Sequence, residues 1–158
     1  MAYKCDIIAD SINPQGDRIT SFLVTYPRII HAEFLRHRML SRNSASSRAI
    51  PFKKMIKQVE EDPFIPIAWQ KHHTGMQGSE YIEDDYYPNK HWLIARDEAL
   101  ASAKRLSNND ISKQILNRII EPYLWHTELI TGTEFKNFFE LRTGAYEIDL
   151  DKLEELSL

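Results

Sequence analysis

At residues 36–48 the chain reads Arg36-His37-Arg38-Met39-Leu40-Ser41-Arg42-Asn43-Ser44-Ala45-Ser46-Ser47-Arg48. The wider window from Arg28 to Lys57 contains eight Lys and Arg residues and one acidic residue, a net charge of +7, although the whole chain carries −3. Guanidinium forks bind phosphate oxygens bidentately, and small hydroxyl residues let backbone N–H groups approach the same anion. A solvated basic face needs no such density of hydroxyls, so we interpret the stretch as an anion site.

Length and composition limit the class of protein. With 158 residues, 42% of them hydrophobic and 27% charged, the chain predicts one globular domain, residues 1–158, with its own core. Cys5 is the only cysteine, so no disulfide forms within the chain. No apolar run approaches membrane-spanning length, and the N-terminus lacks the apolar region of a signal peptide. We therefore expect a cytoplasmic protein with no membrane partner.

The spacing of apolar residues predicts strands and helices together. Tyr3–Ala9 and Thr20–Tyr26 are the expected strands, and the turn residues at 13–17 predict that they form an antiparallel hairpin. Helices are expected after Pro27 through Phe34, over 52–59, over 92–106, over 111–119 and over 135–142, with a loop-rich stretch at 64–90. This order predicts an α/β protein of the α+β kind, a small antiparallel sheet surrounded by helices.

Several familiar chemistries lack their residues in this chain. It has no Gly-rich nucleotide loop of the Rossmann or Walker kind, so any nucleotide must be held by another device. His72 and His73 have no partner at metal-ligand spacing, and we expect no metal site. Cys5 lies in an expected strand with no histidine near it in sequence, which predicts an inert, part-buried thiol. An anion site without a protein nucleophile favours a bound cofactor that does the hard chemistry.

The sequence resembles the flavin-dependent thymidylate synthases (ThyX). The signature of that family is matched by Arg36-His37-Arg38, seven further residues and then Ser46, with Asn43 and Arg48 also in place. Two more blocks follow in the family's order, at 118–122 and 138–142. The segments 41–51 and 121–135 resemble in particular the version found in phages. The resemblance covers roughly residues 5–142.

The resemblance implies a specific activity. Members are homotetramers with an α/β fold and with active sites at subunit junctions that hold FAD and dUMP. Reduced flavin, recharged by NADPH, supplies reducing equivalents, and methylenetetrahydrofolate supplies the carbon that becomes the methyl group of dTMP. No cysteine attacks the uracil, in agreement with the lack of a plausible catalytic cysteine here. The expected location is the cytoplasm of a bacterium or of a phage-infected cell.

The resemblance also assigns roles to residues, position by position. Contacts to FAD are expected from Arg36, His37, Arg38, Ser44 and Asn137. Contacts to dUMP are expected from Glu33, Arg36, Ser44, Ala45, Ser46, Ser47, Arg48, Arg118 and Arg142, with Arg142 as the catalytic residue that promotes ionisation of uracil N3. Charge physics agrees for Arg142, because negative charge that develops on the uracil edge is stabilised by a guanidinium that keeps its own proton.

Three features depart from the family pattern. Ser47 stands where many members have Gly, and Glu33 stands where many have Gln. After Arg142 the chain ends at Leu158, whereas members usually continue with a further segment and a long helix. The chain is therefore expected to be either a compact phage-like enzyme or a member that has lost activity.

Other functions stay open beside the synthase. The same flavin and folate chemistry supports a dUMP hydroxymethylase, and the folate-side residues that separate the two activities are not identified in the sequence. A catalytically silent member would bind nucleotide or serve as an assembly subunit. A nucleic-acid-binding module could use the 28–57 window, but this window has few aromatic residues for stacking and the chain is acidic overall, so we expect no nucleic-acid partner.

Overall fold

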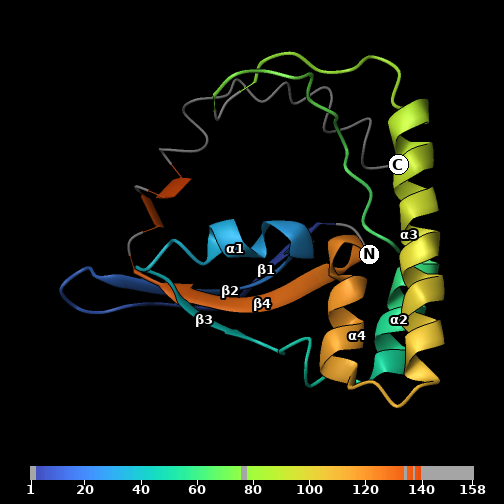
Figure 1. Ribbon diagram of the computed structural model, residues 1–158. Coiled ribbons are helices and arrows are strands. Elements are labelled where there is room, and N and C mark those ends of the chain that lie inside the picture. The colour runs from blue at the N-terminus through green and yellow to red at the C-terminus, as the bar shows by residue number, and fades with distance from the viewer. Residues whose placement is uncertain (1–2, 76–77, 134, 137, 140–158) are drawn as a thin grey trace.

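The computed structural model describes residues 3–75, 78–133, 135–136 and 138–139 (Figure 1). Asn137 and Arg142, two of the expected site residues, lie outside the described residues. The described chain forms one antiparallel sheet of four strands in the order β1-β2-β4-β3, with helices beside it. The expected α+β class with a small antiparallel sheet is confirmed. The strands are β1 (Lys4–Ile12), β2 (Arg18–Pro27), β3 (Ser41–Ser44) and β4 (Trp125–Gly132).

The first hairpin forms as the sequence predicts, and both of its strands extend beyond the expected ranges. In the turn, Asn13 Oδ1 accepts hydrogen bonds from the backbone N–H groups of Gln15 and Asp17, at 3.0 and 2.8 Å. Gly16 adopts φ +93°, a conformation that costs little only for glycine. The expectation that Cys5 is part-buried is wrong, because β1 is the edge strand and Cys5 is exposed.

Two strands, β3 and β4, were not expected. Strand β4 lies between β2 and β3 and pairs with both, with Tyr26 opposite His126 and Asn43 opposite Leu129. Its buried positions alternate as a strand requires, but two of them hold His126 and Glu128 instead of apolar residues. The centre of the sheet therefore carries buried polar side chains close to the expected anion site.

The helices are η1 (Arg28–Ile30), α1 (His31–Phe34), α2 (Phe52–Glu61), α3 (Tyr86–Ser107), α4 (Lys113–Ile119) and η2 (Glu121–Tyr123). The helix expected after Pro27 is confirmed but short, so residues 36–38 lie in turns beyond its end. Helix α3 begins at Tyr86, before the expected start, with Pro88 in its first turn, where a missing N–H costs nothing. The loop-rich stretch therefore ends at residue 85.

Helices α2, α3 and α4 stand together at one end of the sheet (Figure 1). They enclose the apolar core, which consists of Met55, Ile56, Val59, Leu100, Ala103, Ile120, Tyr123 and Leu124. This core fixes α4 and η2 against α2, and the segment between β3 and α2 is anchored to the same bundle. None of the helices in the described parts of the chain is long and apolar enough to cross a membrane.

Candidate functional site

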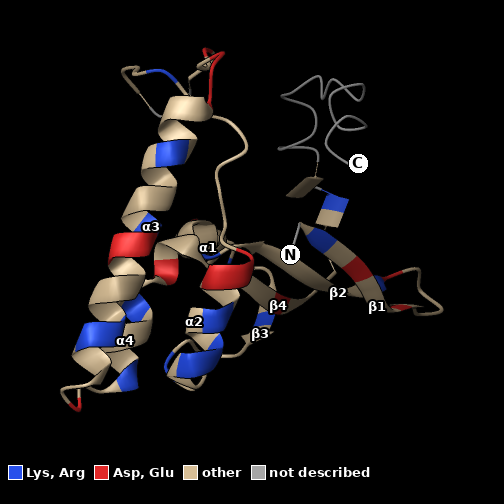
Figure 2. Cartoon of the chain, turned by 90° about the vertical axis from the view of Figure 1, so that its right-hand side faces the viewer, with Lys and Arg blue, Asp and Glu red and all other residues tan. Residues whose placement is uncertain are grey.

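The last residues of the expected anion stretch, together with Ala49, form a tight turn between β3 and α2. Ala49 donates its backbone N–H to Ser46 O at 2.9 Å, and Arg48 N lies 3.3 Å from Ser46 Oγ. The side chains of Ser46 and Arg48 are exposed, whereas Ser47 is buried. Lys and Arg positions also lie on α2, which follows this turn, and on α4 (Figure 2). The turn thus presents an exposed hydroxyl and an exposed guanidinium in a basic environment.

Side chains of helix α4 donate hydrogen bonds to backbone carbonyls of this turn. Asn117, fully buried, donates from Nδ2 to Ser47 O at 2.6 Å and to Ile50 O at 3.0 Å. Lys113 Nζ lies 3.3 Å from Ala49 O. Three carbonyls of the segment therefore accept hydrogen bonds from α4, which fixes how the turn is oriented.

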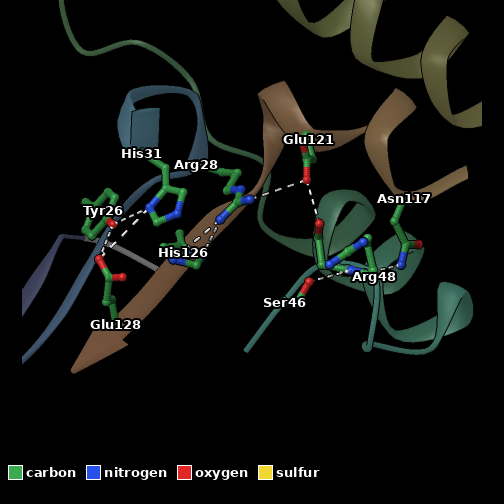
Figure 3. Close-up of polar contacts among 10 residues, drawn as sticks. Tyr26, Arg28, His31, Ser46, Arg48, Asn117, Glu121, His126 and Glu128 are labelled. Atoms are coloured by element: carbon green, nitrogen blue, oxygen red, sulfur yellow. Dashed lines mark hydrogen bonds and ion pairs between the residues drawn. The ribbon is translucent and has the colours of Figure 1, made fainter. Parts of the chain in front are cut away.

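Glu121 in η2 joins the turn to the sheet. Its Oε1 accepts a hydrogen bond from Ser47 Oγ at 2.6 Å and lies 3.6 Å from Arg28 Nη2 (Figure 3). Arg28, the first residue of η1 directly after β2, donates from Nη1 to the ring of His126, 3.2 Å from Nδ1. A guanidinium can only donate, so the ring of His126 accepts and is neutral. Burial, together with Arg28 and His31, lowers the pKa of His126 to about 4.

A second polar group lies on the sheet beside Arg28. Tyr26 Oη donates to Glu128 Oε2 at 2.7 Å and lies 2.8 Å from His31 Nδ1. The hydroxyl has one proton, which goes to the carboxylate, so His31 Nδ1–H donates to Tyr26. Burial and then the hydrogen bond to Glu128 raise the pKa of Tyr26, and burial with Arg28 lowers the pKa of His31. Both rings therefore stay uncharged near neutral pH.

The side chains of His31, His126 and Glu128 have possible metal ligand atoms close to one another. Single ligand atoms of His31, His126 and Glu128 all lie within 4.8 Å of one another. However, the guanidinium of Arg28 already lies against His126, and the hydroxyl of Tyr26 lies between Glu128 and His31. A second cation beside Arg28 would be repelled, so we interpret the group as a hydrogen-bonded network.

Two cavities flank the contact between Arg28 and His126. The smaller, of about 360 Å³, is lined by Arg28, Ile29, His31, Ala32, Leu35, Arg118, Glu121 and Pro122. The larger, of about 540 Å³, is lined by Ala45, Ile50, Lys54, Lys57, Gln58, Glu61, Asp62, Trp125, His126 and Thr127. Two expected dUMP contacts therefore face different cavities: Arg118 lines the smaller cavity and Ala45 lines the larger one. Glu121, which accepts the hydrogen bond from Ser47, lines the smaller cavity.

The remaining expected residues lie mostly at the surface. Glu33, Arg36, Arg38, Ser44, Ala45, Ser46, Arg48 and Arg118 are exposed, and His37 is half-buried with its ring 5.3 Å from that of Phe138. Among the described residues no carboxylate forms an ion pair with the guanidinium of Arg36, Arg38, Arg48 or Arg118. Four exposed guanidiniums without a carboxylate partner among the described residues suit a ligand with several negative charges.

Sequence reasoning assigned no role to several polar residues that build this region. They are Tyr26, Arg28, His31, Asn117, Glu121, His126 and Glu128. A usable signal was the period-two alternation of polar residues at 126 and 128 in a stretch that otherwise reads as a strand. Nothing in the local sequence marks Asn117, since its partners lie 67 to 70 residues earlier.

The fold has counterparts among solved structures. The UMP/dUMP methylase PolB from Streptomyces cacaoi, bound with 5-Br UMP, is similar with a TM-score of 0.58 and 15% sequence identity, over 84% of this chain and 71% of that chain. Another structure of PolB, bound with 5-Br dUMP, has a TM-score of 0.54 and 18% identity, over 73% of this chain and 49% of that chain. No protein-family model and no curated protein matches the sequence. At these identities the likeness establishes the fold alone.

Proposed function

We propose that this protein is a flavin-dependent thymidylate synthase, which methylates dUMP to dTMP with methylenetetrahydrofolate, NADPH and FAD. The observation that carries the proposal is the buttressed 46–49 turn, with exposed Arg48 and Ser46, next to the cavity that Arg118 lines. The same fold serves a methylase of uridine nucleotides in another organism. The motif at 36–48 and its resemblance to ThyX add the flavin and the folate.

The turn is suited to the phosphate of dUMP. The guanidinium of Arg48 offers a bidentate fork, and the Ser46 hydroxyl offers a neutral donor to the same anion. Arg118, from the end of α4, would approach the nucleotide from the side of the smaller cavity. This proposal also keeps Glu33, Arg36, Ser44 and Ala45 as dUMP contacts, and Ser47, whose hydroxyl is bound to Glu121, as part of the turn that holds the phosphate.

The segment 36–38 fits the pyrophosphate of FAD. Arg36 and Arg38 are exposed cations without a carboxylate partner among the described residues, and the ring of His37 offers a planar edge between Phe34 and Phe138. Ser44 and Asn137 complete the assigned FAD contacts. Bound FAD would supply reducing equivalents, which NADPH replenishes.

Arg142 is the proposed catalytic residue. Its guanidinium would stabilise negative charge that develops on the N3–O2 edge of uracil, a role that a planar, permanently charged group serves best. In Arg142→Lys the charge remains but the fork is lost, so kcat should fall much more than the affinity for dUMP. Equal losses in both would make Arg142 a binding residue, and full activity in Arg142→Ala would remove it from the mechanism.

A homotetramer with sites at subunit junctions is part of this proposal. Strand β1 leaves large apolar side chains in solvent, with Ile7 65% and Ile12 66% exposed, as expected of a surface that another subunit covers. The expected dUMP contacts also face two cavities of one chain, so a second copy could complete each site. Light scattering that detects only monomer at micromolar concentration would contradict this part.

UMP is a second candidate substrate, because the similar methylase acts on both UMP and dUMP.

The experiment that tests the proposed function supplies dUMP or UMP, with methylenetetrahydrofolate and NADPH, to purified protein whose absorbance spectrum has been recorded. We expect stoichiometric flavin bands and a methylated product from dUMP by mass spectrometry. A hydroxymethylated product would assign the hydroxymethylase reaction, and a flavin-free protein that binds dUMP without turnover would assign a silent member. Arg105→Ala, an exposed arginine at the end of α3, is the matched control for the arginine variants.

A further inference from the structure

In the described part of the chain, the hydrogen bonds between α4 and the 46–50 segment all go to carbonyl groups of the segment. Asn117 binds the carbonyls of Ser47 and Ile50, at 2.6 and 3.0 Å, and Lys113 Nζ lies 3.3 Å from the carbonyl of Ala49. An asparagine has the two N–H donors that two carbonyls need, whereas aspartate of the same shape has none. Because Asn117 is fully buried, a residue without N–H donors at this position would leave the two carbonyls without their partner.

The carbonyl contacts determine where the amides of the turn point. In a planar trans peptide the carbonyl of one residue and the N–H of the next lie on opposite sides. When Ser47 O faces α4, the N–H of Arg48 therefore faces away from α4. The hydrogen bond between Arg48 N and Ser46 Oγ agrees, since it places the Ser46 hydroxyl on that same outer side. Ile50 N–H follows the same rule through the carbonyl of Ala49.

Glu121 fixes the other end of this arrangement. Its Oε1 takes the hydroxyl of Ser47 at 2.6 Å, so that this hydroxyl is turned inward while the hydroxyl of Ser46 is turned outward. The adjacent ion pair to Arg28, at 3.6 Å, ties the carboxylate to the residue directly after β2. Two neighbouring serines thus have different orientations, which the α4–η2 segment imposes.

We propose that Asn117 and Glu121 are positioning residues for the phosphate of the substrate: they bind the inner side of the 46–50 turn, and so aim the Ser46 hydroxyl, which the Arg48 N–H holds on the outer side, and the Arg48 side chain at one anion. This inference rests on the proposed function, because it takes the anion to be the phosphate of dUMP. Asn117 is fully buried and lines neither of the two cavities, whereas Glu121 also lines the smaller one. Their contribution is pre-organisation, which lowers the entropic cost of ordering the turn when the phosphate binds.

The test compares dUMP with deoxyuridine, which lacks the phosphate, by competition calorimetry on the flavin-loaded protein. Asn117→Leu removes both donors at similar volume and without a change in charge, and Gln114→Leu makes the same exchange at an exposed position of α4. We expect Asn117→Leu to weaken dUMP at least about tenfold and deoxyuridine by less than about twofold, because only the phosphate contacts depend on the turn. Gln114→Leu should leave both affinities unchanged.

Thermal unfolding distinguishes positioning from a purely structural role. If Asn117→Leu lowers the melting temperature but keeps the wild-type ratio of dUMP to deoxyuridine affinity, the inference is overturned and the proposed function stands. If the wild type itself does not prefer dUMP to deoxyuridine, the proposed function fails and the inference with it. Should Asn117→Leu not fold, Glu121→Met decides: it removes the acceptor of the Ser47 hydroxyl at similar volume, the side chain is partly exposed, and the same loss of preference, several-fold in size, is expected. An unchanged preference in Glu121→Met would overturn the inference.

Discussion

The 46–50 turn and the 36–38 segment carry the same chemistry, arginines in a short polar stretch, but the chain holds them differently. The turn is fastened by buried or half-buried side chains from α4 and η2, with Asn117 and Glu121 as the main contacts. In the 36–38 segment the backbone bonds are local, with Arg36 N bound to Glu33 O at 3.2 Å and His37 N bound to Phe34 O at 3.2 Å.

This difference separates two ways to build an anion site. At the turn, the folded chain fixes the geometry in advance, so we expect binding to depend on distant buried residues. At 36–38 the guanidiniums are exposed, so we expect binding to depend on charge and on salt. Variants of the two regions should therefore affect one region and spare the other.

The largest effect is expected at His126 in β4, in the dependence of the free energy of unfolding on pH. The pKa of His126 is about 4 in the folded protein and about 6.5 in the unfolded chain, so the unfolded state binds more protons as the pH falls below 6.5. Stability should therefore fall from pH 6.5 to pH 4, by at most about 3 kcal/mol from this residue. Urea unfolding at pH 7 and pH 4.5 measures the loss, which should be smaller in His126→Gln.

The matched control is His72→Gln, which changes an exposed loop histidine. This variant should keep the wild-type dependence of stability on pH. If His126→Gln and His72→Gln lose the same free energy of unfolding between the two pH values, the contact between Arg28 and a neutral His126 does not govern acid stability.

Arg48→Ala should weaken dUMP about 100-fold, because a bidentate, charge-assisted contact to phosphate is lost. The guanidinium is exposed and has no carboxylate partner among the described residues, so the melting temperature should stay close to that of the wild type. Calorimetry with dUMP measures the loss, and flavin absorbance shows that the other region is intact. A similar loss in Arg105→Ala would mean that overall charge, and not the turn, binds dUMP.

Arg38→Ala should weaken FAD about tenfold and spare dUMP, the reverse of Arg48→Ala. The loss should shrink at high salt, because Arg38 is exposed and screened. A fluorescence titration with FAD at two ionic strengths measures both effects. Wild-type affinity for FAD in this variant would remove 36–38 from the flavin site.

The sequence predicted the parts of this molecule whose patterns are local. The hairpin of β1 and β2 follows from its turn residues, and α2 follows from apolar spacing between two prolines. The basic, hydroxyl-rich character of 36–48 likewise predicts an anion site without any knowledge of the fold. Which residues contact a ligand there stays a prediction.

Strand β4 and the contacts that support the turn could not be predicted from the sequence, because both depend on residues that are distant along the chain. The buried side of β4 carries His126 and Glu128, which read as surface residues until Tyr26, Arg28 and His31 are brought next to them. Strand β3 is four polar residues that form a strand because β4 pairs with them. Asn117 works through carbonyls 67 and 70 positions away, a relation that no local pattern encodes.

The smallest expected effect concerns Glu33, the one acid of the basic window. Its side chain is exposed and precedes Arg36 by three residues, so its negative charge should oppose a phosphate weakly. Glu33→Gln should therefore raise the affinity for dUMP by about twofold to threefold at low salt, and the gain should disappear at high salt. Glu83→Gln, an exposed acid near the start of α3, is the control and should change nothing. If Glu33→Gln instead weakens dUMP, the carboxylate accepts a hydrogen bond from the nucleotide, and the 36–38 side of the site then recognises the base or sugar as well as charge.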